Sequence, residues 1–195
     1  MPQKQWGVYS HKAAKVDHPL LRDVNTRFDA PHSRHNDVSR EQLEAAGLTV
    51  LAESPGVGVH LAVSPDGFRA VYFQGHPEYA AISLLKECKR EVHRYLHGER
   101  DKEPRIPENY LTPEGEQLLA AHIEAVLTAR ERGDTSLEFP EEALLPHVDN
   151  TWGDTGRAIV NNWLGLVYQL TNLERQRQFM PGVDPDDPLM LNTAT

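Results

Sequence analysis

Apolar residues in the first part of the chain fall into short runs that favour β-strands. Residues 48–52, 57–63 and 68–74 are rich in aliphatic, β-branched and aromatic side chains. The segment Ser64-Pro65-Asp66-Gly67 lies between two of these runs and predicts a tight turn, because proline presets φ and glycine accepts a positive φ. We therefore expect three strands over 48–74, as part of a mostly parallel sheet.

From Tyr79 onward the apolar positions recur every three to four residues, which is the spacing of one helix face. The first such face is formed by Ile82, Leu85, Cys88, Val92 and Leu96. These positions predict a helix over residues 79–97. A second helix is expected from Thr112 to near Gly133, because threonine caps a first turn well and Pro113 suits the first helical position.

A last apolar stripe predicts a third helix. Its members are Ile159, Val160, Trp163, Leu164, Val167 and Leu170. The chain beyond Thr171 is polar and interrupted by proline, so residues 173–195 are expected to form a tail. Strands that precede helices indicate an α/β fold, but a complete doubly wound sheet shows more strand–helix units than this chain does. The sequence is typical of part of a domain.

Composition excludes several classes of function. The 195 residues carry 29 acidic and 20 basic side chains, a net charge of −9, so no basic surface is expected to bind nucleic acid. Apolar runs are far shorter than the roughly 20 residues of a membrane span, and the N-terminus lacks the apolar core of a secretory signal. The single cysteine excludes an internal disulfide framework and fits a cytoplasmic protein.

The strongest chemical signal is the segment Gly75-His76-Pro77-Glu78, at the junction of a hydrophobic strand and a helix. Open α/β sheets place ligand sites at the carboxyl ends of their strands. In an extended segment His76 and Glu78 point the same way, so the carboxylate can orient the imidazole and stabilise its protonated form. We expect a catalytic base and its orienting residue here; the alternative is a turn with a solvent-exposed histidine and glutamate.

Two other groups of histidines have the residue types of metal ligands. His32, His35 and Asp37 lie within six residues, and His93 and His97 are one helical turn apart. Neither group has a further ligand at the spacing that zinc sites and metalloprotease helices require. We interpret the first as a polar loop and the second as a solvated helix face, and we expect no metal site.

Cys88 is the sole thiol available as a nucleophile. It falls on the apolar stripe of the 79–97 helix, where a buried thiol behaves as a small hydrophobe. We therefore interpret Cys88 as a core residue, which leaves the His76–Glu78 pair without a nucleophile in this sequence.

Several motifs, in this order, resemble the C-terminal portion of the homoserine O-acyltransferases, also called homoserine O-succinyltransferases. They are Lys4-Gln-Trp-Gly-Val-Tyr-Ser-His11, His18-Pro-Leu-Leu-Arg22, Phe28-Asp-Ala-Pro-His-Ser-Arg34, Leu51-Ala-Glu-Ser54, Gln74-Gly-His-Pro-Glu-Tyr79, Lys89-Arg-Glu-Val92, Asn162-Trp-Leu-Gly165 and Tyr168-Gln169. The resemblance implies a class I glutamine-amidotransferase-like (flavodoxin-like) three-layer α/β fold, here incomplete, with extra C-terminal helices. Residues 1–172 would form the C-terminal part of that domain, with a helical insertion over 111–150.

The resemblance also implies a reaction of methionine biosynthesis. A cysteine takes the acyl group from acyl-CoA as a thioester, and the hydroxyl of homoserine then attacks that thioester. By this resemblance His76 is the general base, Glu78 orients it, and Lys4 and Ser33 bind substrate. Arg90 matches an arginine that binds the amino-acid substrate, as a guanidinium suits a carboxylate. The nucleophilic cysteine of the family lies in an upstream segment that this sequence does not contain.

The implied partners are L-homoserine and succinyl-CoA or acetyl-CoA as co-substrate, with no further cofactor. A separate N-terminal half, and a homodimer when the protein is complete, are also expected. Two alternatives remain open from the sequence: a glutamine-amidotransferase-like hydrolase built on the same residues, and a non-catalytic fragment. The Ala30-Pro-His-Ser-Arg34 motif argues against the first, and the joint presence of His76, Glu78, Ser33 and Arg90 argues against the second.

Overall fold

A curled five-stranded sheet forms the centre of the computed structural model, which describes residues 3–174 and 176–192. The strands lie in the order β2-β1-β3-β4-β5. Their bounds are Gln5–Ala13 for β1, Arg27–Arg34 for β2, Thr49–Ser54 for β3, Gly58–Val63 for β4 and Val71–Phe73 for β5. The three strands expected over 48–74 are confirmed, and the chain is a mixed α/β structure.

The pairings between the described strands are all antiparallel, so the expectation of a mostly parallel sheet is wrong. The physical reason is the length of the connections. Residues 55–57 join β3 to β4, and residues 64–70 join β4 to β5. Parallel neighbours require a crossover of roughly a dozen residues or more, whereas connections this short reverse the chain.

The expected helices form, with small changes at their ends. They are α2 (Ser83–Leu96), α3 (Pro113–Glu131) and α5 (Gly153–Leu170), and shorter elements are α1 (Arg40–Ala45), α4 (Glu141–Leu144), η1 (Pro19–Leu21) and η2 (Leu145–His147). Thr112 caps α3 by accepting the Gly115 N–H at its hydroxyl oxygen, as expected. Helix α2 begins at Ser83 rather than Tyr79, because the preceding residues form hydrogen-bonded turns, with Tyr79 N–H bound to the His76 carbonyl.

Strand β2 and helix α1 were not visible in the sequence pattern. Residues 30–37 were expected to form a polar loop, yet residues up to Arg34 belong to β2. Strand β2 pairs with β1 from Gln5 opposite Arg34 to Lys12 opposite Arg27. This partner strand supplies the backbone hydrogen bonds that no local pattern reveals. Helix α1 begins with a capping box, in which Ser39 and Gln42 satisfy each other's backbone N–H groups.

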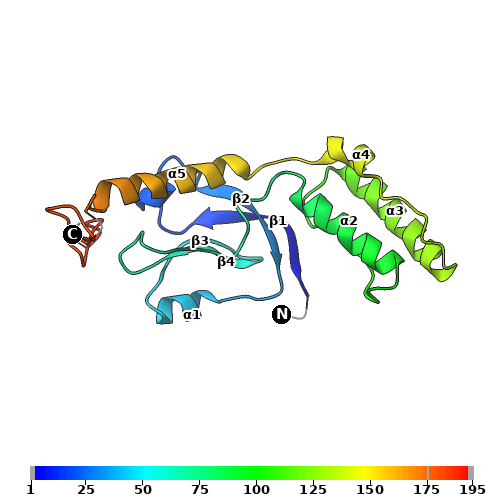
Figure 1. The fold of residues 1–195 in the computed structure, drawn as a ribbon, viewed down its shortest axis with the longest axis horizontal. Coiled ribbons are helices and arrows are strands. Elements are labelled where there is room, and N and C mark those ends of the chain that lie inside the picture. The colour runs from blue at the N-terminus through cyan, green and yellow to red at the C-terminus, as the bar shows by residue number, and fades with distance from the viewer. Residues whose placement is uncertain (1–2, 175, 193–195) are drawn as a thin grey trace.

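Each face of the sheet has its own helix. Helix α5 covers one face with Ile159 and Leu166, and α1 covers the other with Leu43. Helices α2 and α3 extend to one side of the sheet, where they pack on Trp6 and Val8 of β1 (Figure 1). No helix among the described residues is long and apolar enough to cross a membrane. From these positions of the helices, the loop between β5 and α2 lies where the sheet, α5 and the α2–α3 pair meet.

Candidate active site

His76 and Glu78 form a direct pair in the loop that follows β5. The Nδ1 atom of His76 lies 2.8 Å from Oε1 of Glu78, which confirms the expected contact. The expected extended segment is wrong, because residues 76–79 form a turn closed by a hydrogen bond from the Tyr79 N–H to the His76 carbonyl. The backbone N–H of His76 donates to the Pro31 carbonyl at 2.7 Å, so β2 anchors the loop. The side chains are 32% and 67% exposed, and both are accessible to a ligand.

This geometry sets the tautomer of the imidazole. A carboxylate accepts hydrogen bonds, so the Nδ1 atom of His76 carries the proton that it donates to Glu78. The lone pair of the neutral ring is then at Nε2, on the side away from the carboxylate. A ring held in this way can accept a proton at Nε2 while Glu78 stabilises the resulting charge.

Gly75 allows the loop to approach the sheet closely. A Cβ atom at this position would lie 2.7 Å from Nδ1 of His60, 2.8 Å from Nε2 of His32 and 2.8 Å from the Pro31 carbonyl oxygen. Real Cβ contacts are longer than this, so glycine is required for the close approach of the backbone. Gly75 therefore sets the position of the His76 backbone, from which the imidazole side chain extends.

A second group of side chains converges on Glu87 of α2. Its Oε2 atom accepts hydrogen bonds from Ser33 Oγ at 2.6 Å and from Lys4 Nζ at 2.8 Å. Its Oε1 atom accepts from the Tyr79 hydroxyl at 2.7 Å. The Tyr79 ring in turn stacks on the His76 ring, with centroids 4.3 Å apart. Lys4, Ser33, His76 and Glu78 are thus joined into one site through Tyr79 and Glu87.

The electrostatics of this group hold Glu87 ionised. Burial raises the pKa of Glu87, but the hydrogen bonds from Lys4, Ser33 and Tyr79 outweigh burial, and the net shift is downward. Burial and the neighbouring Glu87 carboxylate raise the pKa of Tyr79 to about 12, so its hydroxyl remains a donor. The centre of the network is therefore an anion held by one cation and two hydroxyl groups.

Arg90 is the one sequence-predicted site residue outside this network. It lies on α2 one turn after Glu87, its side chain is 61% exposed, and its Nε atom is 3.9 Å from Oε1 of Glu91. The guanidinium therefore faces solvent on the same side of the helix as the network, without a contact to His76 or Glu78 among the hydrogen bonds and ion pairs of the described residues.

An open cleft adjoins the His76–Glu78 pair. Its volume is about 520 Å³, and its lining includes Phe73, Glu78, Tyr79, Asn150, Arg157 and Val160. The walls come from the β5–α2 loop and from the first turns of α5. A cleft of this size next to a base and an orienting carboxylate can hold a small polar substrate.

Cys88 does not belong to the site. The residue is fully buried in the α2–α3 core, and its Sγ atom lies 3.8 Å from the Arg105 carbonyl oxygen. Burial raises the pKa of the thiol to about 12, so the nucleophilic thiolate is suppressed. The interpretation of Cys88 as a core residue is confirmed.

Of the two histidine groups considered in the sequence, the first does not come together and the second forms a stacked pair. His32 is buried, whereas His35 and Asp37 are exposed, and Asp37 instead pairs with Arg34 at 2.7 Å. His93 and His97 stack on the exposed face of α2 with ring centroids 4.0 Å apart.

Sequence reasoning missed Tyr79 and Glu87 as site residues. Tyr79 ends a quoted motif, but nothing in the pattern assigns it a role. Glu87 lies beside the apolar stripe of the helix, one position before Cys88. That position signals a partly buried charge, but its partners lie 54 and 83 residues away in Ser33 and Lys4, which no local spacing reveals.

Comparison with known proteins identifies the family. Residues 1–173 match the family described as homoserine O-succinyltransferase. A protein of that name from Methylobacter tundripaludum is 54% identical over 191 residues, which is 98% of this chain and 54% of the relative. One from Methylococcus capsulatus is 55% identical over 188 residues, and one from Thioalkalivibrio nitratireducens is 56% identical over 186 residues. These alignments cover 96% and 95% of this chain, and 53% and 52% of the relatives. The chain spans about half the length of the curated relatives that it matches.

Proposed function

Because the chain belongs to the homoserine O-succinyltransferase family, we propose that it carries the proton-transfer pair and part of the substrate site for acyl transfer to L-homoserine. The observation that supports this most directly is the 2.8 Å contact between His76 Nδ1 and Glu78 Oε1 beside an open cleft. Succinyl-CoA or acetyl-CoA is the acyl donor and a co-substrate, and no resident cofactor takes part.

The proposed reaction has two steps. In the first, Nε2 of His76 accepts the proton of a cysteine thiol while the sulfur attacks the thioester carbonyl carbon of acyl-CoA. The bond to the CoA sulfur breaks, and CoA leaves as a thiol with the proton from His76. In the second step His76 accepts the proton of the homoserine hydroxyl, whose oxygen attacks the enzyme thioester, and the cysteine leaves and is reprotonated.

Glu78 stabilises the imidazolium in both steps, because its carboxylate already accepts the Nδ1 proton. In this proposal the nucleophilic cysteine lies on polypeptide outside these 195 residues, either continuous with them or a separate half. The burial and raised pKa of Cys88 support this. The proposal therefore implies that this chain holds only part of the complete active site.

In this proposal the network around Glu87 binds the substrate. Lys4 and Ser33 face the substrate, and Glu87 is a positioning residue that holds both through hydrogen bonds. Arg90 lies one turn further along α2 with an exposed guanidinium, 3.9 Å from the Glu91 carboxylate, and a guanidinium suits the carboxylate of homoserine.

The finer architecture follows the same proposal. Residues 1–172 form the C-terminal part of a class I glutamine-amidotransferase-like domain, residues 111–150 are a helical insertion, and residues 173–195 are a tail. The complete protein is a cytoplasmic homodimer.

The test is to assemble this chain with the remaining half of the Methylobacter tundripaludum relative, as a fusion and by co-expression. Formation of O-acylhomoserine from homoserine and each acyl-CoA is measured by mass spectrometry. We expect His76→Gln to abolish the product and Glu78→Gln to lower kcat, while His93→Gln, an exposed histidine, retains activity. Arg90→Gln should raise the KM for homoserine, with Arg94→Gln as the matched control on the same helix.

Two results would overturn the proposal. One is full activity in the His76→Gln assembly. The other is release of ammonia from glutamine with no acylation of homoserine, which would identify a hydrolase.

A further inference from the structure

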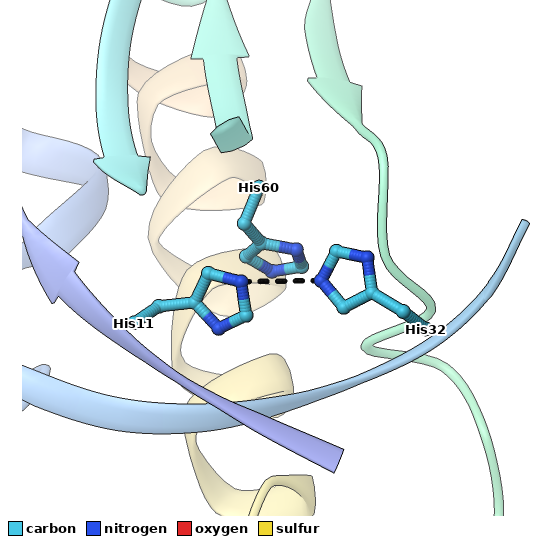
Figure 2. Close-up of side chains that lie close together, drawn as sticks. All are labelled: His11, His32 and His60. Atoms are coloured by element: carbon cyan, nitrogen blue, oxygen red, sulfur yellow. Dashed lines mark hydrogen bonds between the residues drawn. The ribbon is translucent and has the colours of Figure 1, made fainter. Parts of the chain in front are cut away.

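Three buried imidazole rings extend from strands of the sheet and lie close together, next to the β5–α2 loop. They belong to His11 of β1, His32 of β2 and His60 of β4, and Figure 2 shows the rings converging from three different strands. Their exposed fractions are 1%, 0% and 1%. One ring nitrogen from each lies within 4.8 Å of the other two. Apolar rings flank the cluster, with Phe28 stacked on His11 and Phe73 beside His60.

We propose that His11, His32 and His60 form a binding site for one divalent transition-metal ion of the zinc type. Three imidazoles without a carboxylate or thiolate are a donor set that suits zinc, copper, nickel or iron and does not suit calcium or magnesium. The proposal concerns a structural site and does not depend on the acyl-transfer reaction.

The hydrogen bonds of His11 already have the arrangement of a metal ligand. Its Nδ1 atom lies 2.8 Å from the Tyr9 carbonyl oxygen, to which it donates its proton, so the lone pair at Nε2 faces the cluster. Histidines that bind metals commonly donate their second ring N–H to a backbone carbonyl in this way. His11 Nε2 is 3.1 Å from His32 Nε2, close to the roughly 3.3 Å that separates two nitrogens on one tetrahedral zinc ion.

His60 supplies an unsatisfied atom. Its Nδ1 nitrogen is buried and has no hydrogen-bond partner. A buried polar atom without a partner is unfavourable, and such atoms are uncommon in folded proteins. The Gly75 backbone packs closely against this atom, and a Cβ there would lie 2.7 Å from His60 Nδ1 and 2.8 Å from His32 Nε2, so these two nitrogens face a common point. An ion held by the three rings would give His60 Nδ1 the partner that it lacks.

The charge state of the rings fits a cation. Burial lowers the pKa of His11 to about 4 and that of His32 to about 3, and it lowers the pKa of His60 well below its ordinary value, so all three rings are neutral near pH 7. Neutral imidazole is the form that binds metals, and no proton must leave a charged ring first.

Metal binding by His32 requires one hydrogen bond of Arg34 to break. Its Nε–H donates to Nδ1 of His32 at 3.1 Å, so His32 now carries its proton at Nε2. Binding through Nε2 moves that proton to Nδ1, and the Nε–H of Arg34 loses this acceptor. The other guanidinium nitrogens remain bound to Asp37 and to the Val57 carbonyl, and Asp37 offsets the positive charge nearby.

The test uses the whole chain, purified in chelator and then supplied with Zn²⁺ or Co²⁺. The His93→Gln variant serves as the background, because it removes the exposed His93–His97 pair that could hold surface metal. We expect about one zinc ion per chain to remain after gel filtration, and cobalt to give the visible absorption of a tetrahedral site. Adding His60→Gln should weaken binding at least tenfold.

A second measurement avoids dependence on a variant that could fail to fold. In ¹⁵N-labelled protein with the three histidines native, zinc should shift the Nε2 resonances of His11 and His32 and the Nδ1 resonance of His60, and leave His18 and His35 unchanged. Absence of retained metal, or metal retained with no shift at these three rings, would overturn the proposal.

Discussion

Ser33 Oγ donates a 2.6 Å hydrogen bond to Glu87 Oε2, and this bond ties the end of β2 to the middle of α2. The same carboxylate oxygen accepts from Lys4 Nζ at 2.8 Å. One acidic side chain therefore holds two expected substrate-binding residues in place. Because the Glu87 side chain is only 12% exposed, loss of its charge has consequences for folding as well as for substrate binding.

Glu87→Gln should lower the free energy of unfolding by about 1–3 kcal/mol, since Lys4 loses its counter-ion and the hydroxyls of Ser33 and Tyr79 lose a charged acceptor. Urea unfolding followed by circular dichroism measures this change. The matched control is Glu99→Gln, at a 57% exposed position whose nearest cation is 3.8 Å away. It should change stability by less than about 0.5 kcal/mol. Equal effects of the two substitutions would contradict the role of the Glu87 network.

Gly75→Ala should destabilise the chain by about 1–3 kcal/mol, because the new Cβ meets two imidazole nitrogens and a backbone oxygen at under 3 Å. Gly165→Ala is the comparison, since its Cβ meets nothing within 4 Å and the residue lies inside α5. That substitution should stabilise by about 0.5–1 kcal/mol, as alanine is the better helix former. In thermal unfolding, Gly75→Ala should lower the Tm and Gly165→Ala should raise it. A rise or no change for Gly75→Ala would contradict the close packing at Gly75.

Stability should fall as pH falls below about 6.5. Burial lowers the pKa of His11 to about 4 and that of His32 to about 3, so between these values and 6.5 the unfolded chain binds protons that the folded chain does not. The free energy of unfolding therefore rises with pH across this window, by up to about 1.4 kcal/mol per pH unit for each histidine.

Urea unfolding between pH 7 and pH 5, in chelator, measures this slope. His93→Gln, at an exposed position, should leave the slope unchanged, whereas His11→Gln should reduce it. A slope that is the same in both variants would show that the buried histidines do not control acid stability.

Cys88 should react with iodoacetamide very slowly in the native chain and readily after unfolding in urea. The thiol is fully buried, and burial raises its pKa to about 12. For the same reason incubation with succinyl-CoA should leave the intact mass of the isolated chain unchanged, with Cys88→Ser as the control. An acyl adduct that disappears in Cys88→Ser would place the nucleophile in this chain after all.

The isolated chain should self-associate through the outer face of α5. Val160, Leu164 and Tyr168 recur at four-residue spacing there, with exposed fractions of 45%, 53% and 82%. A stripe of this kind beside the edge strand β5 is an association hazard. Leu164→Glu should raise the monomer fraction in analytical ultracentrifugation, whereas Leu173→Glu, exposed outside the helix, should not. A native chain that is monomeric at micromolar concentration would show that the outer face of α5 does not drive self-association.

The sequence by itself determined the features that depend on near neighbours. Helices α2, α3 and α5 follow from apolar spacing, and the start of α3 follows from Thr112 as a cap. The burial of Cys88 follows from its place on a helix stripe, and the contact between His76 and Glu78 follows from a separation of two residues. Interactions within one or two turns of chain are specified locally.

The tertiary structure alone decided how distant segments meet. Strand β2 shows no clear strand pattern, and the antiparallel pairing of the sheet depends on short connections whose direction apolar runs do not encode. Glu87 joins Ser33 and Lys4 across 54 and 83 residues, and the three buried histidines come from β1, β2 and β4. Such contacts form because strand register and helix packing place the side chains together, and neither is a property of any single segment.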